Sequence, residues 1–293
     1  SSRPGNENTA ITLRGGVSTN KDVNPLVLID GVEAYMWELS QMNPADIESV
    51  SVLKDASASI YGNKAGAGVI LVTTKRGKEG KTSVTYNGSV HANLLGKRFP
   101  VADGVTWGQM YLQSVANDAV ANNGVERWWM WSEDAWKAIA RGEIYEGIEG
   151  GRWRHLDPYV NHFDEIYGTT WGQNHNVSIN SGSEKVKVLT SLGYSRDRSL
   201  VDVVFDGQKK YNFRTNVDYQ LHKYVKTEFN ISYDNRLVDI PTQGVGNGVT
   251  DFYVFPLRNP PGQSYDTFSG ERNVLSHVIE GGRTKGWEEV FRL

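Results

Sequence analysis

Residues 211–221 read Tyr-Asn-Phe-Arg-Thr-Asn-Val-Asp-Tyr-Gln-Leu, so that every second side chain is apolar or Thr. Successive side chains of a strand point to opposite faces of a sheet, and this run therefore predicts a strand with one apolar and one polar face. Its length is close to the roughly 9–11 residues that a tilted strand needs to cross a bilayer. The polar face would hold Asn212, Arg214, Asn216, Asp218 and Gln220.

The same alternation recurs along the chain. It is clear over residues 84–94 and 225–234, and weaker over 174–180 and 186–194. We therefore expect about five amphipathic strands after residue 80. Residues 182–184 and 222–224 predict tight turns, whereas 96–173, 196–209 and everything after 236 are long connections. Short turns on one side and long loops on the other are the plan of an outer-membrane barrel.

The part before residue 80 has a different character. Short β-branched runs at 11–14, 25–29, 49–53 and 69–74 are separated by turn and cap signals. Asp30-Gly31 is a tight-turn pair, and Asn43 precedes a proline at the first position of a short helix. Asp55 is expected to cap a helical stretch over 56–61 that Gly62 ends. This pattern predicts a small α+β domain.

Composition excludes several classes. The net charge of -3 gives no field that would favour nucleic acid, and the absence of cysteine excludes disulfides and thiolate metal sites. No run approaches the roughly 20 apolar residues of a spanning helix, so a membrane role requires strands. The N-terminus lacks the pattern of a signal peptide.

The first long loop predicts helices over 106–117 and 131–140 and is rich in tryptophan. Aromatic faces can stack on sugar rings, so these side chains are possible substrate contacts, although packing between the loop helices is favoured over ligand contact. The candidates are Trp128, Trp129, Trp131, Trp136 and Trp153.

No motif anchors catalysis. The glycines of residues 62–68 follow a helix and enter a strand, which is the reverse of a dinucleotide fingerprint. Neighbouring acids such as Glu133-Asp134 and Asp164-Glu165 are expected to be solvated, and the histidines lack metal-ligand spacing. We therefore expect no enzyme activity, no cofactor and no metal.

One long stretch resembles a known family. Residues 47–62, Ile-Glu-Ser-Val-Ser-Val-Leu-Lys-Asp-Ala-Ser-Ala-Ser-Ile-Tyr-Gly, and 66–77, Gly-Ala-Gly-Val-Ile-Leu-Val-Thr-Thr-Lys-Arg-Gly, resemble the plug signature of SusC/RagA-like TonB-dependent transporters. Residues 13–16 and 25–32 resemble preceding plug segments, and 174–185 with 191–194 resemble the first barrel hairpin. The structural plug positions implied by the resemblance are Glu48, Lys54, Asp55, Tyr61, Gly62, Gly66 and Gly68.

The resemblance implies an α+β plug over residues 1–80, followed over 81–293 by the start of an antiparallel transmembrane β-barrel. Relative to the family, the signal, an extra N-terminal domain, the TonB-contacting segment and most of the barrel are missing, so we expect a fragment. The implied function is TonB-driven import of a glycan, oligosaccharide or peptide across a Gram-negative outer membrane. The implied partners are a SusD-like surface lipoprotein, TonB and outer-membrane lipid.

Two other interpretations stay open at this point. A soluble, secreted β-rich carbohydrate-binding module would use the tryptophans as its site and would need no detergent. A signalling receptor of the same architecture would need an N-terminal regulatory domain.

Overall fold

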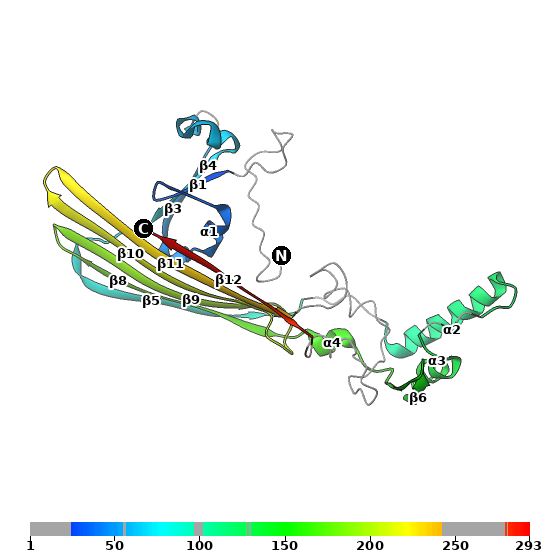
Figure 1. Ribbon diagram of the computed structural model, residues 1–293. Helices are drawn as coiled ribbons and strands as arrows, with labels where there is room; N and C mark the ends of the chain where they lie inside the picture. The colour runs from blue at the N-terminus through cyan, green and yellow to red at the C-terminus, as the bar shows by residue number, and fades with distance from the viewer. Residues whose placement is uncertain are drawn as a thin grey trace.

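The computed structural model describes residues 25–54, 57–96, 102–126, 128, 130–241, 279 and 281–293. The predicted strand at 11–14 and the predicted cap Asp55 lie outside these residues. The described chain forms a four-stranded sheet, a six-stranded sheet and a two-stranded hairpin with its helices. We call these parts the plug domain (25–78), the barrel sheet and the insertion (102–169) (Figure 1).

The plug domain is a mixed sheet in the order β2-β1-β4-β3, with β1 and β4 parallel and the other neighbours antiparallel. The predicted Asp30-Gly31 turn is confirmed, because both residues have positive φ, 50° and 86°, between β1 and β2. Its elements are β1 (Leu26–Ile29), β2 (Val32–Ala34), α1 (Met36–Gln41), η1 (Pro44–Asp46), β3 (Ile47–Leu53), η3 (Ser59–Ala67) and β4 (Val69–Thr74).

Both faces of the central plug strands are covered. Val27, Ile70 and Val72 pack with Met42 on one face, while Leu28 and Val69 pack against η3 on the other. Strands buried on both faces read as continuous apolar runs rather than as alternating ones. This explains why residues 26–29 and 69–72 lack the two-residue period of the later strands.

The barrel sheet is antiparallel throughout, in the order β12-β11-β10-β9-β8-β5. Its strands are β5 (Gly80–Asn93), β8 (Thr170–Gly182), β9 (Val186–Arg198), β10 (Gly207–His222), β11 (Val225–Pro241) and β12 (Arg283–Arg292). The strands predicted after residue 80 are all present, and β8 and β9 are longer than their weak alternation indicated. Strand β12 was not among the strands that the alternation predicted, because Lys285 and Glu289 interrupt the apolar positions of its outward face.

The two faces of the barrel sheet differ as predicted. One face, which we call outward, exposes large apolar side chains such as Val84 (66%), Leu192 (57%) and Phe229 (58%). The other, inward face carries polar side chains and lies against the plug domain (Figure 1). Two residues, Lys223 and Tyr224, join β10 to β11, whereas the insertion joins β5 to β8. Among the described helices, none combines the length and apolar character needed to span a membrane.

The insertion confirms the two predicted helices and extends the first. Its elements are α2 (Gly104–Ala121), α3 (Glu133–Ala140), β6 (Tyr145–Glu149), β7 (Arg152–Leu156) and α4 (His162–Ile166). Asp103 caps α2 and Ser132 caps α3, each accepting a hydrogen bond from a backbone N–H of the first turn. The insertion lies at the end of the barrel sheet away from the two short turns (Figure 1).

Candidate functional site: the interface between plug domain and barrel sheet

Five alternate residues of β10 bond to the plug domain. They occupy the inward face of the strand, and their partners follow one another along the plug sequence in the same order. The β10 residues are Lys210, Asn212, Arg214, Asn216 and Asp218, and their partners are Ser40, Gln41, Asp46, Thr74 with Lys75, and Arg76. We call this set the β10 ladder.

The first two contacts hold the end of α1. Lys210 Nζ donates to the carbonyl of Ser40 at 3.2 Å, and Asn212 Nδ2 donates to the carbonyl of Gln41 at 3.0 Å. Helix ends leave backbone carbonyls without partners inside the helix, so barrel side chains complete them. The Gln41 side chain, 2% exposed, donates in turn to Glu288 of β12 at 2.8 Å. The helix end is therefore tied to two strands.

The third contact buries an ion pair. Asn43 accepts a hydrogen bond from the backbone N–H of Ala45 and so starts η1, which presents Asp46 to the sheet. Asp46 Oδ2 lies 3.7 Å from Nε of Arg214, and both side chains are buried. Burial raises the pKa of Asp46 above its ordinary value, against the opposing effects of a hydrogen bond to Ser191 and the charges of Arg214 and Lys75. The ion pair thus offsets only part of the desolvation.

The fourth contact lies at the end of β4. Asn216, 1% exposed, donates through Nδ2 to Thr74 Oγ1 at 3.0 Å and to the Lys75 carbonyl at 2.7 Å. Thr74 is itself fixed by Asp30, whose carboxylate accepts from its backbone N–H at 2.8 Å and from its hydroxyl at 2.6 Å. The hydrogen bonds thus form a chain from the amide of Asn216 through the hydroxyl of Thr74 to the carboxylate of Asp30. This chain links the β10 ladder to the β1–β2 turn.

The fifth contact is a charged group of four side chains. Arg76 Nη1 lies 2.7 Å from Asp218, and its Nη2 lies 3.2 Å from Glu228 of β11. Lys226 also approaches Asp218, at 3.3 Å. The Arg76 side chain is 24% exposed and that of Asp218 is 11% exposed, so the pair is only partly screened by water.

Two glycines allow the close approach. A Cβ at Gly77 would lie 2.5 Å from the backbone nitrogen of Val188 on β9, which is too close for any side chain. A Cβ at Gly193 would lie 2.4 Å from Asn43 Nδ2, so the side chain that caps η1 would have to move. The absence of a side chain at these two positions therefore sets how near the plug domain lies to the barrel sheet.

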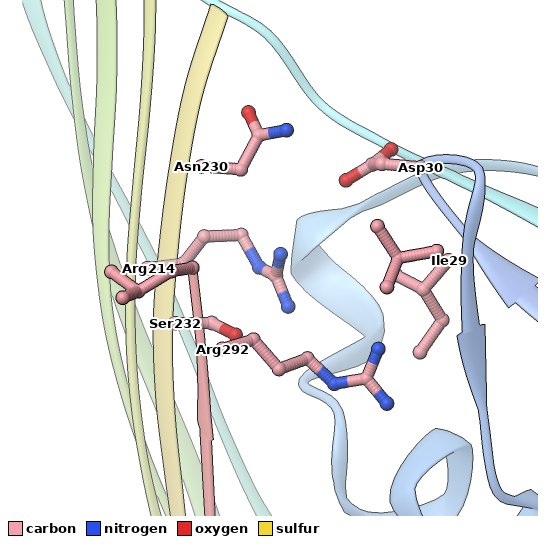
Figure 2. A pocket seen from close by; sticks show the side chains of 8 residues that line it. Ile29, Asp30, Arg214, Asn230, Ser232 and Arg292 are labelled. Atoms are coloured by element: carbon pink, nitrogen blue, oxygen red, sulfur yellow. The ribbon is translucent and has the colours of Figure 1, made fainter.

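A small hollow remains between the two parts near the β1–β2 turn. Figure 2 shows Arg214, Asn230 and Ser232 projecting from the barrel strands toward Ile29 and Asp30. Within the described residues, Ser232 Oγ and Asn230 Oδ1 are buried without a hydrogen-bond partner. A polar hollow of this kind suits water.

The predicted plug positions lie elsewhere in the domain. Glu48 and Lys54 are exposed on or just after β3, and Glu48 stands where the β3–β4 register shifts. Tyr61 is 37% exposed on η3. Gly62 and Gly68 have φ of 72° and 98°, which favour glycine, whereas a Cβ at Gly66 would meet open space. Asp55 lies outside the described residues.

Sequence reasoning therefore did not single out the residues that join the two parts. On β10 they belong to the predicted polar face, and the alternation was the signal that pointed to them. On the plug domain, Thr74 and Arg76 lie in the stretch that resembles the plug signature, but neither they nor Asp46 were predicted to contact the sheet, because their partners on β10 are far away in the chain.

The tryptophans of the insertion form a packed cluster. Trp136 is fully buried and Trp131 is 4% exposed, and the ring of Trp136 lies 4.5 Å from Trp131 and 5.1 Å from Trp107, centroid to centroid. Trp128 packs against the edge of this cluster. Trp153 is 45% exposed, and Trp129 lies outside the described residues. Of the described candidates, Trp153 offers the most open ring face.

The interface holds the plug domain against the barrel sheet through polar contacts. Among the described residues it brings together no nucleophile, base and oxyanion donors. In the part of the chain that the structure describes, no three metal-ligating side chains gather. The chemistry of the interface is that of hydrogen bonds and ion pairs which water can replace once the two parts separate.

Comparisons with known proteins agree with this architecture. The family model "TonB-dependent Receptor Plug Domain" matches residues 1–69. The TonB-dependent receptor SusC of Bacteroides thetaiotaomicron is 34% identical over 213 residues, which are 70% of this chain and 17% of that protein. The TonB-dependent receptor P26 of Formosa agariphila is 29% identical over 268 residues, 89% of this chain and 24% of that protein.

Among solved structures, the RagAB peptide importer in its closed-closed state matches with a TM-score of 0.60 at 20% identity. The match covers 86% of this chain and 28% of that one. At this identity the likeness concerns the fold. The chain spans about a fifth of the length of the first two curated relatives, which are several times longer.

Proposed function

We infer that the protein containing this chain, which belongs to the SusC/RagA-like TonB-dependent receptors, imports a nutrient across the outer membrane of a Gram-negative cell. The substrate class that we propose is an oligosaccharide or a peptide, and a SusD-like surface lipoprotein would close over the long-loop end. TonB would supply the energy by acting on the plug domain. We place the boundary between plug and barrel at residues 80 and 81.

The observation that carries this proposal is the polar character of the plug interface. The β10 ladder consists of hydrogen bonds and ion pairs, and each hydrogen bond contributes only about 0.5–1.5 kcal/mol net because water competes for the same groups. If apolar packing held the plug domain, its departure would expose apolar surface to water, which is unfavourable. A plug held by polar contacts can move aside while water takes over its partners.

The outward face of the barrel sheet supports the proposed location in the outer membrane. Its exposed apolar side chains suit hydrocarbon surroundings, in which a sheet must close on itself so that every backbone group is bonded. A soluble carbohydrate-binding module would leave this face in water. No catalytic role enters the proposal, since the relatives are described as receptors.

A reversible lock tests the proposal. The 293-residue chain has no cysteine, so the double substitution Thr74→Cys and Asn216→Cys would place two thiols where side chains now lie 3.0 Å apart. The matched control is Thr190→Cys with Thr215→Cys, whose hydroxyls lie 2.9 Å apart but join only β9 to β10. Uptake of a panel of labelled oligosaccharides and oligopeptides would be measured in cells producing the full-length protein.

We expect the oxidised 74–216 pair to block uptake and a reductant to restore it, while the control pair leaves uptake unchanged. Uptake that continues with the 74–216 disulfide formed, as verified by mass spectrometry, would overturn the proposal that the plug domain must leave β10.

A further inference from the structure

A row of cations lies just beyond the tyrosines on the outward face. Tyr194 on β9 and Tyr211 on β10 are cross-strand partners whose ring centroids lie 5.2 Å apart. Tyrosines at the end of an apolar stretch are typical of the aromatic girdle of an outer-membrane barrel. The next outward positions toward the long-loop end are Arg196 and Lys209, which stand directly opposite each other across β9 and β10. On β9 and β10 the apolar positions thus end in tyrosines and then in positive charge, whereas Leu237 on β11 and Trp287 on β12 keep apolar side chains exposed beside Lys209.

The cations gather around one ring. Phe205, from the connection between β9 and β10, lies 5.1 Å from the guanidinium of Arg196, 5.7 Å from that of Arg198 and 5.6 Å from Lys209 Nζ. We call Arg196, Arg198, Lys209 and Phe205 the rim cluster. One aromatic ring has two faces, so it cannot compensate three cations fully.

Only part of this charge has a partner. Arg198 donates to the carbonyls of Val201 at 3.1 Å and Val204 at 2.8 Å, which fixes the connection. On the neighbouring strands, Arg283 pairs with Asp239 at 2.7 Å.

Arg196 and Lys209 remain available. No carboxylate among the described residues forms an ion pair with either of them. The structure therefore leaves two cations, side by side on the outward face, that an anion would complete.

We propose that Arg196 and Lys209 bind the phosphate of an outer-leaflet lipid, with lipid A as the chemical type. This rests on the proposed function, because long loops mark the extracellular side of an outer-membrane barrel and so place the rim cluster at the outer leaflet. An Arg fork with a neighbouring Lys is a suitable phosphate site, and Phe205 would pack against the lipid beside it.

Lipid retention tests the inference. The full-length protein would be purified from outer membranes in mild detergent and titrated with phosphorylated lipid A, with the same lipid lacking its phosphates, and with phosphatidylglycerol. Native mass spectrometry would count bound lipid. The variant is Arg196→Gln with Lys209→Gln. The matched control is Lys223→Gln, since Lys223 also lies over an aromatic ring, that of Tyr224 at 4.7 Å, but at the short-turn rim.

A basic side chain at a lipid surface contributes roughly a fivefold change in binding, so the double variant should bind phosphorylated lipid A about 25-fold more weakly. Lys223→Gln should bind it as the unchanged protein does, and the dephosphorylated lipid should not distinguish the three proteins. Equal binding of phosphorylated lipid A by variant and unchanged protein would overturn the inference, and so would stronger retention of phosphatidylglycerol than of lipid A.

The same preparation separates this inference from the proposed function. Recovery of the protein in the outer-membrane fraction, with a heat-dependent shift on gels, is measured before any lipid is added. A protein absent from that fraction would contradict the proposed function, whereas a membrane-inserted protein with unaltered lipid binding would contradict only the lipid site.

Discussion

Arg76 of the plug domain and Asp218 of β10 form an ion pair with 2.7 Å between Nη1 and Oδ1, across 142 residues of sequence. The pair stands at the short-turn end of the β10 ladder, and Arg76 also reaches Glu228. This charged contact holds the plug domain against two strands of the sheet at once. The energetics of plug movement should therefore depend on it.

A single thiol can report that movement. Ser232 is 2% exposed beneath the plug domain, and its hydroxyl has no hydrogen-bond partner among the described residues, so Ser232→Cys should preserve the interface. The thiol reacts only when the plug domain moves away, and the labelling rate then reports the free energy of local opening. The reporter requires the full-length protein with no other accessible thiol.

Replacing Arg76 by Gln should accelerate labelling. Asp218 and Glu228 lose their shared partner, and contacting charges of this kind couple by about 0.5–3 kcal/mol, equivalent to roughly a 2- to 150-fold change in rate. In a double-mutant cycle, adding Asp218→Asn to the Arg76→Gln variant should have a smaller effect than Asp218→Asn alone. Additive effects would show that the two residues do not act as a pair.

Replacing Gly77 by Ala should also open the interface. The new methyl group would collide with the backbone of β9, and such overpacking costs about 1–3 kcal/mol. The matched control is Gly286→Ala on β12, where the nearest atom lies at 4.0 Å and the effect should stay within about 0.5 kcal/mol. Equal labelling rates in the two variants would mean that the plug domain sits farther from the sheet.

Plug docking should strengthen as the pH falls. Burial raises the pKa of Asp46, so the docked plug domain binds a proton more readily than an undocked one whose Asp46 faces water. The stabilisation begins as the pH falls through the raised pKa and is complete below the ordinary value of 3.8. Labelling should slow over this range after correction against a thiol at the exposed short turn, in Lys223→Cys.

Asp46→Asn supplies the comparison for the pH series, because the amide cannot titrate. After the same correction, its labelling rate should vary less with pH over this range. A titration that persists unchanged in this variant would assign the effect to another group.

In the insertion, Trp136→Ala and Trp153→Ala should separate packing from substrate contact. Removing the fully buried Trp136 should cost the insertion about 3–5 kcal/mol, seen as earlier thermal unfolding by near-ultraviolet circular dichroism. Trp153 is 45% exposed, so its removal should cost less than about 1 kcal/mol. Reduced uptake by the Trp153→Ala variant without loss of stability would assign that ring to substrate.

The alternating strands could be predicted because their physics is local. Asn212, Arg214, Asn216 and Asp218 alternate with apolar residues or Thr, so the period of two set both the strand and its faces. The turn at Asp30-Gly31 was equally local. The alternation did not reveal strand β12, because charged residues on its outward face hide the period of two. Its pairing with β11 depends on a strand far away in sequence.

For the interface between plug domain and barrel sheet, the sequence predicted the polar face of β10 but not its partners on the plug domain. Polarity on one face of β10 indicated that polar groups or water lie there, but not that Asn216 would contact Thr74 and Lys75. Such pairings depend on how the plug domain docks, which no short-range pattern encodes. The resemblance drew attention to Glu48 and Lys54, which are exposed residues of the plug domain and not members of the β10 ladder.

The most direct test of the account is labelling of the Ser232→Cys thiol in living cells, with and without TonB. If the plug domain is moved from β10 by TonB, labelling should be faster in cells with TonB and an energised inner membrane than in cells lacking TonB, and fastest during uptake. An identical, slow labelling rate in both kinds of cell, while uptake proceeds, would contradict the claim that the β10 ladder opens during transport.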